Sequence, residues 1–304
     1  MNRKIRIGTR DSKLALWQAH TVQALLEARH ISTELVPVKS EGDLDLVTPL
    51  YAMGVQGVFT KTLDAYLLSD KIDIAVHSLK DVPTQFAQGL MQAAVLKRGP
   101  VHDIFVPHPS KTSTHGHAVI GTGSVRRKAQ WLNRYPDARI DNLRGNVQTR
   151  LQKLADSDWD GAIFAAAGLE RIGLRPEYAQ DLDWMLPAPS QGAVMIACRA
   201  TDGDTLEACA PLNDADTALC VQIERDFLKT LMGGCSTPIS AYAELIGDTI
   251  RFRGNILSTD GKEKMEIERT VPRAEASGIG FSTAQELLEQ GADRIVQSIR
   301  NLGA

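Results

Sequence analysis

Short apolar segments alternate with amphipathic, helix-period segments through the first two-thirds of the 304-residue chain, and this alternation limits the fold more than any other feature. Residues 4–8 (KIRIG) predict a strand, and residues 11–29 follow with apolar side chains at helical spacing behind Ser12, a suitable N-cap. Residues 72–79 (IDIAVHSL) predict a strand that is buried on both faces. Such alternation is typical of α/β folds.

The same pattern begins again after residues 97–103 (KRGPVHD). Residues 118–124 (AVIGTGS) predict a strand that leads into a helix, and residues 160–169 (DGAIFAAAGL) predict another buried strand. Between them, residues 138–143 predict a strand and residues 146–157 a helix. Two α/β units of similar size imply two lobes with a cleft between them.

The pattern changes from residue 214 onward, where a small α+β domain is expected. Residues 215–232 predict a long amphipathic helix that stops at a Gly-Gly pair. Three alternating segments separated by turn signals predict a three-stranded antiparallel sheet, and they cover residues 238–246, 249–257 and 264–271. Residues 282–300 predict one closing helix, with Ser282 and Gln285 as a capping box.

The overall charge excludes a protein that binds nucleic acid through its net charge, because that charge is −3 at pH 7. No apolar run reaches the roughly 20 residues that a membrane-spanning helix needs, and the N-terminus has no secretory signal. The four cysteines lie far apart without CxxC spacing, and His115 and His117 have no further ligand nearby. We therefore expect a cytoplasmic protein without a metal, a nucleic-acid partner or a membrane.

Arginine residues follow the predicted strands, at the positions where open α/β sheets bind ligands. The set consists of Arg10, Arg126, Arg127, Arg144, Arg150 and Arg171, with Lys80 just beyond a strand. Each one alone is as well explained by a solvated surface, but six at equivalent positions predict an anion site. A nucleotide is disfavoured, because the chain lacks a P-loop motif and Gly121-x-Gly123 lacks a third glycine. Several distributed carboxylates fit better.

Asp81 and Cys235 are the two candidates for chemistry. Asp81 lies in HSLKDVP, and a carboxylate among arginines stays ionised, so it can stabilise a cation or pass protons. Its local sequence alone favours the alternative of a turn residue. Cys235 follows two glycines that let a side chain project into a cleft, although an isolated cysteine is more often structural. The other three cysteines are expected to be buried.

Seven segments, in order along nearly the whole chain, resemble the porphobilinogen deaminase family. They are GTRDSKLALWQA, DIAVHSLKDVP, IGTGSVRRKAQ, LRGNVQTRL, AAAGLERIGL, PSQGAV and LMGGCSTPISAYAEL. The resemblance implies three domains, which are residues 1–97 with 192–212, residues 98–191, and residues 213–304. The first two would resemble type II periplasmic binding proteins, with the chain crossing back near QGAVMIAC, and the third would be the small α+β domain.

The resemblance also implies a monomeric transferase of tetrapyrrole (haem) biosynthesis. It would deaminate porphobilinogen and join four molecules head to tail into linear hydroxymethylbilane, starting from a dipyrromethane cofactor in thioether linkage to Cys235. Asp81 would be the catalytic residue. The cofactor contacts would be Ser78, Lys80, Ser124, Arg126, Arg127, Arg144 and Arg150, and the substrate contacts Arg10, Ser12, Arg171 and Gln191.

One stretch departs from the pattern of that family. Gln56 stands where a Gly-Gly-Lys-Gly loop commonly has its lysine, and Glu41 stands where threonine or arginine is more usual. Each change weakens the attraction of an anionic chain by a point charge. The departure leaves open an impaired or non-catalytic relative that binds pyrrole polycarboxylates. A cysteine hydrolase built on Cys235 is a weaker alternative, because no histidine lies in a comparably marked motif.

Overall fold

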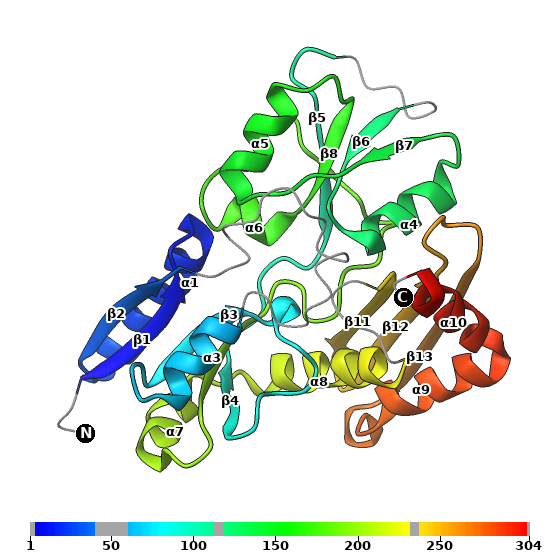
Figure 1. Ribbon diagram of the computed structural model, residues 1–304. Helices are drawn as coiled ribbons and strands as arrows, with labels where there is room; N and C mark the ends of the chain where they lie inside the picture. The colour runs from blue at the N-terminus through cyan, green and yellow to red at the C-terminus, as the bar shows by residue number, and fades with distance from the viewer. Residues whose placement is uncertain (1–3, 40–59, 112–117, 232–236, 303–304) are drawn as a thin grey trace. The chain divides into compact units, whose positions relative to one another are not determined.

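The computed structural model describes residues 4–39, 60–111, 118–231 and 237–302, which form two compact units (Figure 1). The first unit combines the described residues up to 99 with residues 192–219, and the second contains the rest. Each unit has its own five-stranded α/β sheet, and the second unit also contains a separate three-stranded sheet.

The sheet of the first unit has the strand order β2-β1-β3-β10-β4. The strands are β1 (Ile5–Arg10), β2 (Thr33–Val38), β3 (Ile74–Ser78), β4 (Leu90–Val95) and β10 (Val194–Arg199). β1 is parallel to β2 and β3, whereas β10 is antiparallel to its neighbours β3 and β4. The chain thus returns to its first sheet within the QGAVMIAC segment.

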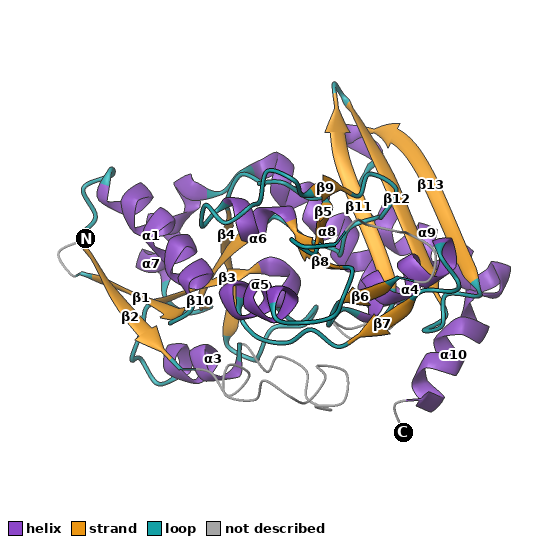
Figure 2. Cartoon of the chain, turned by 90° about the horizontal axis from the view of Figure 1, so that it is seen from above, coloured by secondary structure: helices purple, strands orange, loops and turns teal. Residues whose placement is uncertain are grey.

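Helices cover both faces of this sheet (Figure 2). They are α1 (Lys13–Glu27), α3 (Lys61–Leu68) and α7 (Gly203–Cys209). Ile7 and Ile196 of the sheet belong to one buried cluster with Val22 of α1 and Cys209 of α7. On the opposite face, a Cβ atom at Gly8 would lie 3.1 Å from the Cδ2 atom of Leu63 in α3. Glycine in β1 therefore allows α3 to approach the strand closely.

The α/β sheet of the second unit repeats this arrangement, in the order β7-β6-β8-β5-β9. Its strands are β5 (Asp103–Pro107), β6 (Val119–Gly121), β7 (Arg139–Asp141), β8 (Gly161–Ala165) and β9 (Gln180–Asp181). β6 is parallel to β7 and β8, whereas β5 is antiparallel to β8. Both sheets therefore place three parallel strands beside one antiparallel strand, as in the two expected lobes of the type II periplasmic-binding-protein kind. The sequence pattern did not predict β5 or β9.

Three helices pack on the two faces of the second sheet. They are α4 (Val125–Arg134), α5 (Val147–Ala155) and α6 (Ala166–Glu170). Trp131 of α4 lies in a buried cluster with Phe105 and Ile163, whereas Leu154 of α5 packs with Phe164 on the other face. The short segment after β8 turns into α6 directly, so the expected strand at 160–169 ends at residue 165.

The C-terminal part is the expected small α+β domain. Its antiparallel sheet consists of β11 (Ile239–Ile246), β12 (Thr249–Leu257) and β13 (Lys264–Pro272), in that order. The long helix α8 (Ala215–Thr230) packs on it through Phe227, whose ring centroid lies 5.2 Å from that of Phe252. A Cβ atom at Gly254 would lie 2.5 Å from Phe227 Cζ, so this glycine makes room for the ring. Two 3-10 turns, Ala210–Leu212 and Arg273–Glu275, flank these elements.

The prediction of a single closing helix was wrong. The segment forms α9 (Ile279–Leu287) and α10 (Asp293–Leu302), and Gly291 interrupts them with a φ of 110°, a conformation that glycine adopts without strain. Ser282 is not an N-cap either, because Gly278 begins the helix and accepts the Ser282 N–H at 2.9 Å. The cap at Ser282 was predicted from local sequence alone. The helix begins earlier because it packs against α8 at Gly280, and this tertiary contact is not visible in the local sequence.

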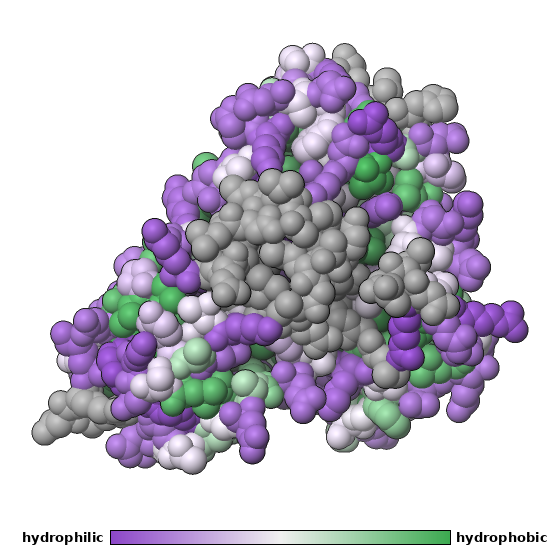
Figure 3. Space-filling view, in the orientation of Figure 1, coloured by the Kyte–Doolittle hydropathy of each residue, from purple (hydrophilic) through white to green (hydrophobic). Residues whose placement is uncertain are grey.

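None of the helices in the described ranges is long and apolar enough to cross a membrane. Figure 3 shows hydrophilic side chains over most of the described part of the visible face, with hydrophobic residues in small separate groups between them. Cys198, Cys209 and Cys220 are buried and form no disulfide, which confirms the expectation that they pack as small hydrophobic residues.

Candidate active site

In the first unit, the candidate residues follow the carboxyl ends of β1 and β3. Arg10 is the last residue of β1, and Ser12 caps α1 by accepting the Ala15 N–H at 3.3 Å. The predicted N-cap is therefore confirmed, while the contact of Ser12 with a substrate stays a prediction. Because β1 and β3 are parallel neighbours, the residues that follow them lie at one edge of the sheet.

Ser78, Lys80 and Asp81 lie together at this edge. Ser78 ends β3, and residues Leu79–Asp81 form a 3-10 turn that continues from it. Gln18 of α1 donates an Nε2–H bond to Ser78 Oγ at 2.7 Å and so holds the start of this turn. Leu79 is fully buried, whereas Lys80 and Asp81 are only half-buried. The turn is thus anchored by an apolar side chain and leaves its cation and its carboxylate accessible to a ligand.

His77, beside these residues on β3, is a buried neutral imidazole. Its side chain is only 6% exposed, and its Nε2 has no hydrogen-bond partner among the described residues. Burial, together with the charge of Arg10, lowers the pKa of His77 from 6.5 to about 4.

Because of His77, the free energy of unfolding is expected to fall as the pH drops from 6.5 towards about 4. The unfolded chain takes up a proton in this range while the folded protein does not, so acid favours unfolding. The full difference is worth about 3 kcal/mol. Urea unfolding of wild-type protein and His77→Gln, at pH values from about 7.5 to about 4.5, checks this.

The His77→Gln curve should fall less steeply with decreasing pH than the wild-type curve. His20→Gln is the matched control, because His20 is an exposed histidine of the same unit. Parallel curves for wild-type protein and His77→Gln would contradict the assignment.

In the second unit, Arg126 and Arg127 share one buried carboxylate, that of Asp103 at the start of β5. Arg126 Nη2 donates to Asp103 Oδ2 at 2.6 Å, and Arg127 Nη2 donates to Asp103 Oδ1 at 2.8 Å. Arg126 Nη1 also donates to the Leu186 carbonyl oxygen at 2.6 Å. Both guanidinium groups are buried, and Ser124 caps the helix that carries them by accepting the Arg127 N–H at 3.4 Å. Sequence reasoning missed Asp103, which lies at the end of the predicted domain boundary.

The electrostatics of this cluster follow from its charges. Burial alone would raise the pKa of Asp103, but the charges of Arg126 and Arg127 outweigh it and hold that pKa below its usual range. Burial lowers the pKa of Arg126, and the charge of Arg127 acts in the same direction while Asp103 opposes it. The carboxylate therefore stays ionised, and it ties the two arginines together as a charge-assisted cluster.

Three of the remaining candidates of the second unit come after parallel strands of its sheet, and the fourth, Gln191, lies in the loop before β10. Arg144 is buried just beyond β7, and Arg150 of α5 donates from Nε to the Gly145 carbonyl oxygen at 2.7 Å. Arg171 caps the C-terminal end of α6, and burial lowers its pKa. Gln191 is also buried, and it donates from Nε2 to Asp103 Oδ1 at 2.9 Å. Asp103 thus joins three predicted site residues in one cluster.

Five residues singled out in the sequence lie outside the described residues, namely Glu41, Gln56, His115, His117 and Cys235. Burial raises the pKa of another thiol, that of Cys209, to about 12, so this cysteine stays protonated and is a poor nucleophile. Within the described ranges, no group of histidine, cysteine and acidic side chains could hold a metal ion.

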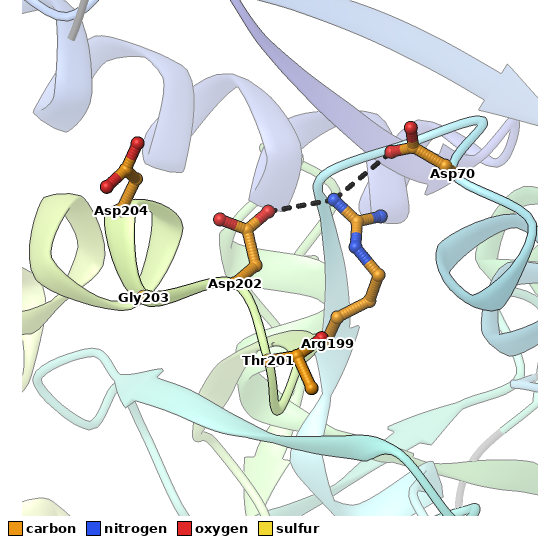
Figure 4. A pocket seen from close by; sticks show the side chains of 6 residues that line it. All are labelled: Asp70, Arg199, Thr201, Asp202, Gly203 and Asp204. Atoms are coloured by element: carbon orange, nitrogen blue, oxygen red, sulfur yellow. Dashed lines mark hydrogen bonds and ion pairs between the residues drawn. The ribbon is translucent and has the colours of Figure 1, made fainter.

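A separate surface hollow in the first unit carries no candidate residue (Figure 4). It is lined by Asp70, Arg199, Thr201, Asp202, Gly203 and Asp204. Arg199 Nη2 lies 2.8 Å from Asp202 Oδ2 and 3.2 Å from Asp70 Oδ1, so its charge is already paired. Because β10 is antiparallel to β3, Arg199 lies at the edge of the sheet opposite to Ser78. The charged side chains that line the hollow therefore form a structural network of ion pairs.

Comparisons with known proteins agree with this arrangement. A family model described as "Porphobilinogen deaminase, dipyromethane cofactor binding domain" matches residues 5–207, and one described as "Porphobilinogen deaminase, C-terminal domain" matches residues 218–289. A curated relative, the porphobilinogen deaminase of Syntrophotalea carbinolica, is 43% identical over 301 residues, which cover 97% of this chain and 96% of the relative.

Solved structures with a similar chain trace include two more distant proteins. A periplasmic substrate-binding protein of an ABC transporter from Coxiella burnetii has a TM-score of 0.43 at 14% identity, covering 73% of this chain and 96% of its own. YhfZ from Shigella flexneri has a TM-score of 0.38 at 15% identity, covering 76% and 97% of the two chains. The family models and the curated relative, which extend along nearly the whole chain, show that the chain belongs to the porphobilinogen deaminase family.

Proposed function

We infer that this chain is a hydroxymethylbilane synthase, a transferase of tetrapyrrole biosynthesis. It joins four porphobilinogen molecules head to tail and releases one ammonia for each, and a final hydrolysis with one water gives linear hydroxymethylbilane. The observation that carries this conclusion is the 43% identity to a curated porphobilinogen deaminase along 97% of the chain. The first family model names a dipyrromethane cofactor, so the chain uses this group as its primer.

The arginine set fits a group that carries several carboxylates. The dipyrromethane group, when bound, supplies a pyrrole α-carbon as the point of attachment for the first porphobilinogen unit. Arg126 and Arg127 share a single carboxylate within the chain, and Arg126 Nε has no acceptor among the described residues. Their donors therefore exceed the acceptors around them, which suits an incoming carboxylate. We assign to the cofactor Ser78, Lys80, Ser124, Arg126, Arg127, Arg144 and Arg150.

Asp81 is assigned the catalytic role. Loss of ammonia from porphobilinogen leaves a cationic methylene-pyrrole, and a nearby carboxylate stabilises such a cation and accepts protons during bond formation. Asp81 is half-buried in the 3-10 turn that also carries Lys80, which keeps its carboxylate accessible. This accessibility supports the role.

Four residues are assigned to the substrate, and one cysteine to covalent attachment. The substrate contacts are Arg10, Ser12, Arg171 and Gln191, which come from the strand ends or loops of both units. We assign the thioether to Cys235, because the other three cysteines are buried. A thiol attached to the primer keeps every addition effectively intramolecular.

We further propose the three-domain division at residues 97/98, 191/192 and 212/213, and a monomeric protein of the cytoplasm. The presence of two separate sheets in the second unit supports the boundary between the second and third domains. Each sheet has its own buried apolar residues, as independent domains do.

Incubating the purified protein with porphobilinogen tests the proposed function. We expect hydroxymethylbilane and ammonia in a ratio of one to four, together with a protein whose denatured mass exceeds that of the chain by two condensed pyrrole units. Binding of porphobilinogen without product would instead identify a binding-only relative. No added mass and no product, even after incubation with preformed hydroxymethylbilane, would overturn the proposal.

A further inference from the structure

Asp103 is a buried carboxylate of the second unit that is held by several neighbouring groups. It begins β5 and is fully buried, and its backbone carbonyl accepts the Leu182 N–H at 2.9 Å. Its two oxygens divide between the arginines: Oδ2 accepts from Arg126, and Oδ1 accepts from Arg127 and also from Gln191. The strand thus fixes the carboxylate, and the carboxylate fixes both guanidinium groups.

The Asp103 carboxylate balances the charge of only one of the two arginines. Arg126 is 4% exposed and Arg127 5% exposed, and each pairs only with Asp103 among the acids of the described ranges. Two buried positive charges therefore face one negative charge. A buried charge without a partner is costly, so the cluster gains from one further anion.

The geometry also restricts where that anion can bind. Arg127 donates from Nε and Nη2 to the same oxygen, at 3.1 and 2.8 Å, and from Nη1 to the Ile163 carbonyl oxygen at 3.1 Å. Three of its nitrogens are thereby oriented by the sheet, and Arg126 is oriented by Asp103 and the Leu186 carbonyl oxygen. Guanidinium groups held in this way can recognise a carboxylate at a defined place without first being ordered.

We propose that Asp103 is a positioning residue, which presets the Arg126 and Arg127 guanidinium groups for a carboxylate of the dipyrromethane group. The proposal rests on the proposed function, and it adds an acidic residue to cofactor contacts that are otherwise cations and hydroxyl groups. Beside Asp103, the two arginines carry one positive charge in excess. Because Asp103 orients both guanidinium groups, it also determines where a further carboxylate can bind. We therefore expect the effect of Asp103 on covalent attachment of the cofactor to be separable from its effect on the stability of the protein.

The test compares loading of wild-type apoprotein with that of Asp103→Asn and Asp103→Glu. Apoprotein from cells that cannot make porphobilinogen is incubated with preformed hydroxymethylbilane. The thiol displaces the hydroxyl group as water, so the chain gains all four pyrrole units, and intact mass follows this gain over time. Asp103→Asn removes the charge, whereas Asp103→Glu keeps the charge but displaces it by one methylene group. We expect both variants to load about tenfold more slowly or worse. We also expect a smaller rise in Tm on loading.

Asp73→Asn is the matched control for stability. Asp73 is also fully buried and also shared by two arginines, since it accepts from Arg6 Nε at 3.0 Å and Arg199 Nη2 at 3.2 Å. It lies just before β3, at the end of that strand opposite to Ser78. Asp73→Asn should lower the Tm of the apoprotein but load at the wild-type rate. Asp181→Asn removes an exposed partner of Arg175 from β9 and serves as a second control.

Each outcome decides the question. Folded Asp103 variants that load as fast as wild-type protein would overturn the proposal, and so would loading slowed equally in Asp73→Asn. Failure of both Asp103 variants to fold would assign this residue to stability and overturn it as well. If wild-type protein itself neither loads nor forms product, the proposed function fails instead.

Discussion

Replacing Asp81 by alanine is expected to lower the rate of hydroxymethylbilane formation by at least about a hundredfold, and by as much as about 10⁴-fold. The carboxylate is the only acidic group of the 3-10 turn Leu79–Asp81, at the same sheet edge as Arg10 and Lys80. Without this carboxylate, no acidic group of the turn stabilises the cation formed by loss of ammonia or accepts its protons. Steady-state assays with porphobilinogen measure the effect.

Two further variants separate charge from shape at this position. Asp81→Asn keeps the size of the side chain and should be as inactive as Asp81→Ala, whereas Asp81→Glu retains a carboxylate and should recover part of the activity. Asp204→Ala, which removes an exposed acid beside the hollow of Figure 4, should retain wild-type activity. All variants should still gain covalently bound pyrrole units from preformed hydroxymethylbilane. Robust turnover by Asp81→Ala would rule out the assigned mechanism.

Replacing Cys235 by serine is expected to remove the added pyrrole mass completely and to reduce product formation by about 10⁵-fold or more. A thioether holds the primer at the site, and tethered reactants reach effective concentrations of about 10⁵ to 10⁸ M. A serine hydroxyl is a far weaker nucleophile than a thiol, so the link does not form. Intact mass under denaturing conditions and an assay of hydroxymethylbilane measure the two effects.

Cys220→Ala is the matched control for this change. Cys220 lies in α8, the helix that precedes the Gly-Gly-Cys segment, and its thiol is buried. This variant should keep both the added mass and the activity, with only a moderate loss of stability from the smaller side chain. Added mass in Cys235→Ser would show that the primer is attached elsewhere.

The positions of the candidate residues could be predicted from the sequence wherever strand and helix patterns were local. Arg10, Ser78 and Arg144 follow strands whose apolar runs are visible in the sequence, and parallel neighbours end at the same edge. Ser12 and Ser124 are N-caps because a short polar side chain precedes each helix. The sequence pattern also predicted the three-stranded C-terminal sheet, since its hairpin turns are short.

Other features depend on contacts that no local pattern contains. Asp103 stands at the end of KRGPVHD, which reads as a boundary between domains, and its partners Arg126 and Arg127 lie more than twenty residues further along. Only the pairing of β5 with β8 brings them together. The break between α9 and α10 at Gly291 was missed for a different reason, because a glycine inside a helical pattern is usually tolerated.

The antiparallel strand β10 has a consequence for synthesis of the protein. It lies between β3 and β4, so these two strands have no shared neighbour until residue 199 has left the ribosome. The strands of the second sheet, by contrast, are contiguous from residue 103 to residue 181. The end of β10 at residue 199 lies 104 residues after the end of β4 at residue 95, so at about 5 to 20 residues per second β4 waits for roughly 5 to 20 seconds and the earlier strands wait longer. The second lobe is therefore expected to fold first, and chains cut short before β10 should expose an incomplete N-terminal sheet to aggregation.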